Sequence, residues 1–142
     1  MVAWNRWHPQ DIFPSLWGEI EKLIIMRAVL VSDEVMRELK RKDDALLRWV
    51  KTVGLKGEPP TQEIQLFVQD IMREFPRMVD SRTGKSAADP FVIATAKITS
   101  SHVVTSEHVG KANRPTIPTV CNHFQIPCCN LIDVMRAEEW EF

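Results

Sequence analysis

Apolar residues three and four positions apart predict a series of amphipathic helices along this chain. Pro14, Ser32 or Asp33, and Thr61 are residues that commonly start a helix, and each precedes such an apolar face. The predicted helices span residues 14–26, 33–40, 43–52 and 61–75, a stretch that starts at 89, and then 120–124 and 132–136. The residues expected on the buried faces of the helices at 14–26, 43–52 and 61–75 are Leu16, Ile20, Leu23, Ile24, Leu46, Leu47, Val50, Ile64, Phe67, Val68 and Ile71.

Short apolar runs between the helices predict strands. The runs are Ala28–Val31, Val103–Val104 and Cys128–Leu131, and each is too short to be a helix by itself. Strands that alternate with helices are typical of an α/β fold with a central parallel sheet. At 142 residues the chain is long enough for one domain with a real core, so we expect a single domain over residues 1–142.

Composition excludes some classes of protein. No apolar run approaches the roughly 18 residues that a membrane span needs. The opening lacks the charged and apolar regions of a secretory signal, so we expect a cytoplasmic protein. The three cysteines, Cys121, Cys128 and Cys129, form neither a disulfide framework nor a zinc-site spacing, so reduced thiols are expected.

Charge argues against strong nonspecific DNA binding, because the formal net charge is −1. Local basic clusters remain, and the simplest interpretation is that they are solvated helix ends and loops. The clusters are Lys40–Lys42 and the looser set Arg73, Arg77, Arg82 and Lys85. Gly84-Lys85-Ser86 is not expected to be a nucleotide-binding loop, because Val79 stands where the earlier glycine is required.

Two acidic residues stand where the chain geometry should bring them together. Asp89 is expected to be an N-cap, with Pro90 as the first helical residue, and Glu107 follows the strand at Val103–Val104. In a strand–helix–strand unit the helix begins at the carboxyl edge of the sheet, and the next strand returns to that edge. Converging carboxylates suit a divalent metal ion.

Each of these acids also has a simpler interpretation. Asp89 could be a plain helix cap, and Glu107 could be a solvated acid in a turn. Thr105 and Ser106, beside Glu107, could hold a ligand water or fix the carboxylate by a hydrogen bond.

The order and spacing of several segments resemble the PIN-domain superfamily, in particular a PIN-like branch of unknown function near the VapC-type toxins. The segments are Asp11–Trp17, Val31–Leu39, Asp43–Leu46, Ala88–Ala94 and Val103–Glu107. The resemblance implies a three-layer α/β/α fold and a Mg²⁺- or Mn²⁺-dependent ribonuclease, often a toxin held by an antitoxin. The acids that match the family pattern are Glu38, Asp89 and Glu107, with Glu34 as a substitute metal ligand.

Other residues expected near the site have both a functional and a purely structural interpretation. Glu38 could instead pair with Lys42. Asn5 and Arg6, between Trp4 and Trp7, could contact RNA or simply pack over the sheet edge.

The start of the sequence departs from the family pattern. The first strand and the aspartate that ends it have no counterpart, so we expect both to be missing from this chain and metal affinity to fall. The alternative function is therefore a non-catalytic PIN-like module that acts through protein contacts, with an antitoxin or as a homodimer.

Overall fold

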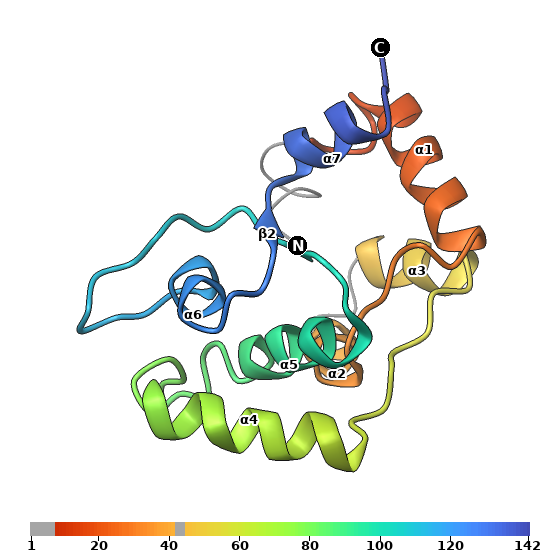
Figure 1. The fold of residues 1–142 in the computed structure, drawn as a ribbon. Helices are drawn as coiled ribbons and strands as arrows, with labels where there is room; N and C mark the ends of the chain where they lie inside the picture. Colours follow the sequence, from red (N-terminus) through yellow and green to blue (C-terminus); the bar gives the residue numbers. More distant parts are fainter. Residues whose placement is uncertain (1–7, 42–44) are drawn as a thin grey trace. The chain divides into compact units, whose positions relative to one another are not determined.

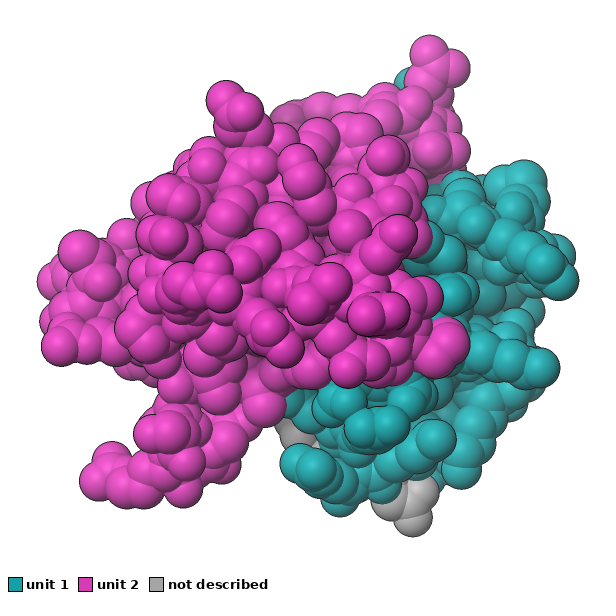
Figure 2. All heavy atoms as spheres, turned by 60° about the horizontal axis from the view of Figure 1, so that its bottom comes forward, with its two compact units in different colours: residues 1–58, 141–142 teal, residues 59–140 magenta. Residues whose placement is uncertain are grey.

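The computed structural model describes residues 8–41 and 45–142, and these residues form a mixed α/β structure of seven helices and a two-stranded parallel sheet (Figure 1). The elements are α1 (Pro14–Ile25), α2 (Asp33–Lys40), α3 (Ala45–Thr52), α4 (Gln62–Glu74), α5 (Asp89–Thr99), β1 (Val103–Val104), α6 (Ile117–His123), β2 (Cys128–Cys129) and α7 (Leu131–Ala137). The chain divides into two compact units, residues 1–58 with 141–142 and residues 59–140 (Figure 2).

The first unit contains α1, α2 and α3. Pro14 starts α1, and the Ser32 hydroxyl caps α2 by accepting the backbone N–H of Val35 at 3.3 Å. The rings of Trp17 and Trp49 meet edge to face with their centroids 5.1 Å apart. These contacts close a small apolar core, whose buried members are Trp17, Met36, Leu39, Leu46, Leu47 and Val50.

The strand predicted at Ala28–Val31 is wrong. The segment has no regular structure and alternates between exposed and half-buried residues, and the nearest parallel bridge joins Ser32, just after it, to Glu58. The carbonyl of Val31 accepts the Glu58 N–H at 2.7 Å, and the Asp33 N–H donates to the Glu58 carbonyl at 2.9 Å. A strand needs a partner with a matching run, and this bridge supplies only one position.

The second unit is built on α4 and α5, which pack against each other (Figure 1). Thr61 caps α4 by accepting the Ile64 N–H at 3.3 Å, as the sequence predicts. Ile71 of α4 and Ile93 of α5 are completely buried. Their cluster, together with the partly buried Phe67, is the larger core of the protein and supports the loops described below.

The parallel sheet joins two short strands of the second unit. Val103 pairs with Cys128 and Val104 with Cys129, which confirms the parallel pairing. The last strand ends before its predicted limit at Leu131, because Asn130 and Asp133 form a capping box that starts α7.

Two C-terminal helices are longer than predicted. The helix expected over residues 120–124 begins at Ile117, and the one expected over 132–136 spans Leu131–Ala137. Within the described residues no helix has the length and apolar character needed to cross a bilayer.

Candidate functional site

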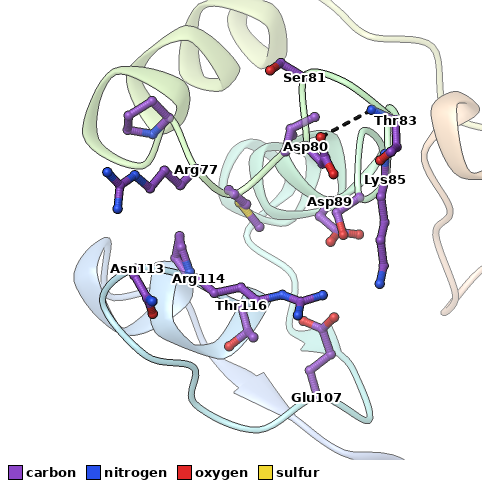
Figure 3. A pocket seen from close by; sticks show the side chains of 15 residues that line it. Arg77, Asp80, Ser81, Thr83, Lys85, Asp89, Glu107, Asn113, Arg114 and Thr116 are labelled. Carbon is purple, nitrogen blue, oxygen red and sulfur yellow. Dashed lines mark hydrogen bonds between the residues drawn. The ribbon is translucent and has the colours of Figure 1, made fainter.

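An open cleft of about 800 Å³ lies in the second unit (Figure 3). Its walls come from the loop after α4, the start of α5 and the loop between β1 and α6. Three acidic residues (Asp80, Asp89 and Glu107) and three basic residues (Arg77, Lys85 and Arg114) line it. The other lining residues are Pro76, Met78, Val79, Ser81, Thr83, Ser86, Asn113, Pro115 and Thr116.

The first wall is a tight loop organised by Asp80. The Asp80 carboxylate accepts the backbone N–H groups of Arg82 and Thr83, at 2.9 and 3.2 Å. These bonds hold the pKa of the Asp80 carboxyl below its ordinary value, with the Arg82 N–H as the largest cause and the charge of Lys85 as a small one. The main chain of Asp80 also bonds to Gly84 and Lys85, so the backbone that carries Lys85 is fixed.

The second wall is the loop from Glu107 to Thr116, which is tied together by hydroxyl groups. The Thr116 hydroxyl donates to the His108 carbonyl at 2.7 Å, and the Thr119 hydroxyl accepts the Gly110 N–H at 2.9 Å. Gly110 is required here, because a Cβ at this position would lie 2.5 Å from the Arg114 carbonyl oxygen. The loop therefore presents Arg114 and Glu107 from a defined backbone.

Asp89 lies at the floor of the cleft, at the start of α5. It is the first helical residue rather than the N-cap, which is Ala88, so the predicted cap position is wrong by one residue. The backbone N–H of Asp89 donates to the Ser86 carbonyl at 3.1 Å, which forms a turn just before the helix. A carboxylate in the first turn interacts favourably with the positive end of the helix dipole.

Glu107 has a structural role that the sequence did not reveal. Its Oε2 atom accepts the backbone N–H of Ile117 at 2.9 Å and so caps the start of α6. The side chain is exposed, as expected of a turn acid, but it is tied to this helix. Thr105 fixes the main chain and not the carboxylate, because its hydroxyl oxygen accepts the Glu107 N–H at 3.1 Å.

Four charged side chains point toward the same space in the cleft (Figure 3). Asp89 and Lys85 come from one side, and Glu107 and Arg114 from the other. Arg77 also lines the cleft, but its guanidinium group points away from these four. The centre of the cleft therefore combines two anionic and two cationic groups.

The remaining predicted site residues lie elsewhere in the chain or outside the described residues. Glu38 and Glu34 are on α2 of the first unit, where Glu34 pairs with Arg37 at 2.6 Å. Asn5, Arg6 and Lys42 lie outside the described residues. The structure thus brings Asp89 and Glu107 to one cleft. The role of Glu38 as a further metal ligand stays a prediction.

The oxygen donors that line the cleft and could hold a hydrated Mg²⁺ or Mn²⁺ ion are carboxylates. Across residues 8–41 and 45–142, no three His, Cys, Asp or Glu side chains gather into a metal-holding group. Mg²⁺ commonly retains several waters and binds through one or two carboxylates together with substrate phosphates. Asp89 and the Oε1 atom of Glu107 are the oxygen donors that would hold it, because Oε2 accepts the Ile117 N–H.

Several residues of the cleft were missed or undervalued from the sequence. Lys85 belongs to a basic cluster that could be seen in the sequence, but Arg114 stands alone in a polar stretch with no pattern around it. Asn113 and Thr116 were not singled out either, although both line the cleft. Only the fold of the loop after β1 brings Arg114 opposite Lys85.

None of the three cysteines lines this cleft, but Cys128 lies near Glu107: burial, and to a smaller extent the charge of Glu107, raises the pKa of the Cys128 thiol. All three are free, and burial raises the pKa of Cys121 to about 12. The Cys121 thiol also donates a hydrogen bond to Cys128, which acts in the same direction. A thiol with so high a pKa is a poor nucleophile and metal ligand near neutral pH, so Cys121 serves the core.

The fold and cleft together define an α/β protein with a mixed-charge site at the ends of a helix and a strand. The family model described as "Domain of unknown function (DUF4411)" matches residues 1–142, so the chain belongs to this family. A comparison with curated proteins found no match, and a comparison with solved structures also found none.

Proposed function

We propose that this protein is a Mg²⁺- or Mn²⁺-dependent ribonuclease of PIN type, with a three-layer α/β/α fold, that cleaves RNA phosphodiester bonds. The observation that supports the proposal is that Asp89 and Glu107, 18 positions apart in the sequence, line one cleft together with Lys85 and Arg114. Nucleases that act through a metal need acidic groups for the cation and space for an anionic substrate beside it. This cleft offers both.

The residues of the cleft have distinct parts in this proposal. Asp89 and Glu107 hold the cation through carboxylate oxygens, and Glu38 is the proposed third acid. When bound, the ion supplies an activated water and neutralises charge that develops on the phosphoryl oxygens. The Ile117 N–H orients Glu107 through the 2.9 Å hydrogen bond, so one oxygen of this carboxylate faces a fixed direction.

Cleavage of a fluorescent RNA in a titration of Mg²⁺ and Mn²⁺ tests this function. We expect activity that chelation abolishes, and a loss of about 100-fold or more in Asp89→Asn and Glu107→Gln, because the metal contributes several kcal/mol. Asp70→Asn is the matched control, since Asp70 is an exposed acid on α4 that pairs with Arg73. Equal cleavage by the wild type and Asp89→Asn, or cleavage that persists in EDTA, would reject the proposal.

A second candidate is a protein-interaction module of a toxin–antitoxin system. Two pairs of exposed apolar side chains, one pair at each end of α1, are the observation that favours it, since exposed apolar surface can serve as a partner site. Those residues are Ile12, Phe13, Ile25 and Met26. Light scattering of the purified chain, alone and with the product of a neighbouring gene, tests it, and a monomer that binds no such product would reject it.

A further inference from the structure

We propose that Lys85 and Arg114 form a phosphate clamp that binds the backbone of single-stranded RNA across the cleft without any divalent cation. The inference rests on the proposed function in one respect, because it takes RNA as the ligand. It goes further by assigning RNA binding to two residues that lie outside the acidic set.

The first observation behind the clamp is the position of the two side chains. Lys85 and Arg114 come from opposite walls, and both point into the space between Asp89 and Glu107 (Figure 3). An anion placed there would meet a cation on each side. The guanidinium group of Arg114 can bind two phosphate oxygens at once, and the Lys85 ammonium adds a compact point charge.

The second step is the order of the backbone beneath each cation. Three hydrogen bonds hold the loop of Lys85, from Arg82 and Thr83 to the Asp80 carboxylate and from Gly84 to the Asp80 carbonyl. On the other wall, Lys111 and Arg114 form an antiparallel bridge, with the Arg114 N–H 2.9 Å from the Lys111 carbonyl. A preordered backbone lowers the entropic cost of binding.

The third step concerns charge. Asp89 and Glu107 would repel a phosphate by themselves, so RNA without metal needs cations close to its own oxygens. Lys85 and Arg114 therefore offset the charge of the two acids and supply the cations that a phosphate in this space needs.

The test measures binding of a short fluorescein-labelled single-stranded RNA to the full chain by anisotropy in EDTA, over a series of NaCl concentrations. The test variants are Lys85→Gln and Arg114→Gln. The matched controls are Arg82→Gln and Lys111→Gln, which remove the same charge from the same two loops at positions that do not line the cleft. Circular dichroism and thermal melts check that all four variants fold.

Each phosphate contact on a single strand contributes about 0.7 to the slope of log K against log salt. We therefore expect either test variant to lower the slope by about 0.7 and to raise Kd about fivefold at about 0.1 M salt. The double variant should lower the slope by about 1.4, and the controls should leave both quantities near wild type.

The outcomes separate this proposal from the ribonuclease proposal. A reduced slope in the test variants with no metal-dependent cleavage would support the clamp and reject the nuclease. Cleavage with equal slopes in test and control variants would overturn the clamp and leave the nuclease standing. Absence of RNA binding in EDTA would also overturn the clamp.

Discussion

Two substitutions of Glu107 can separate its role as the cap of α6 from its proposed role as a metal ligand. Glu107→Ala removes both the oxygen that accepts the Ile117 N–H and the charge. Glu107→Gln keeps an oxygen in nearly the same place and removes only the charge. The pair therefore separates the hydrogen bond from the anion.

The magnitudes follow from the geometry of this cap. A side-chain cap of a helix start contributes about 0.5–2 kcal/mol, and Glu107 is exposed, so we expect Glu107→Ala to lower the free energy of unfolding by about 1 kcal/mol. Glu107→Gln should cost about 0.5 kcal/mol, because only the interaction between charge and helix dipole is lost. For a chain of this size, 1 kcal/mol corresponds to a fall in Tm of about 2–5 °C.

Urea unfolding and RNA cleavage are measured on the same preparations of each variant. Glu63→Ala is the control, because Glu63 is also an acid in the first turn of a helix but Thr61 already caps that helix. We expect Glu107→Gln to be almost as stable as wild type and yet to lose cleavage, whereas Glu107→Ala loses both. A Glu107→Ala variant as stable as wild type would refute the capping argument, and full cleavage by Glu107→Gln would refute the metal role.

Three further substitutions test the core and the two walls of the cleft. Ile71→Ala should lower the free energy of unfolding in urea by about 2–5 kcal/mol, because Ile71 is fully buried. Leu66→Ala, at an exposed position on the same helix, should change it by less than about 0.5 kcal/mol. Similar effects of the two substitutions would contradict the packing of Ile71. Gly110→Ala should destabilise the loop and weaken RNA binding, because the new Cβ meets the Arg114 carbonyl. Gly18→Ala inside α1 meets nothing within 4 Å and should raise the free energy of unfolding by about 0.5–1 kcal/mol. Thermal melts and anisotropy measure the two effects, and a Gly110→Ala variant that melts and binds RNA like wild type would be evidence against the close contact. The lowered pKa of Asp80 means that its ionised form stabilises the fold above pH 3.8 and that this contribution is lost as the pH falls through the lower folded-state value. Urea unfolding should therefore show Asp80→Asn less stable than wild type at neutral pH, with the difference shrinking as the pH falls below 3.8, and an unchanged difference in acid would contradict this.

Local signals allowed the helices to be predicted from the sequence. Pro14, Ser32 and Thr61 each favour a helix start within one turn of their own position, so the sequence alone predicts the bounds of α1, α2 and α4 within about two residues. The strand predicted at Ala28–Val31 is wrong because a strand depends on a partner far along the chain, and among the described residues the bridge beside this segment joins the single position Ser32 to Glu58. The parallel pairing of the last two strands is predictable because a helix lies between them in the sequence.

The candidate site was predictable to the extent that topology alone determines it. Asp89 and Glu107 were placed together because a helix start and a strand end share one edge in an α/β unit. The position of Arg114 in the cleft could not be predicted in this way, because hydrogen bonds of Thr116 and Thr119 shape its loop. No periodic pattern in the sequence indicates such hydrogen bonds. The capping role of Glu107 was hidden for the same reason, since its partner Ile117 is ten positions away.

The cleft is made by two surface loops and one helix end, whereas the buried contacts between α4 and α5 belong to the core. Residues at the tips of these loops, such as Ser81 and Asn113, are exposed and can change without altering the packing of Ile71 and Ile93. Substitutions at these loop tips should therefore change what the cleft recognises while leaving the scaffold intact. For protein engineering, the same separation makes loop exchange the natural route to a new specificity.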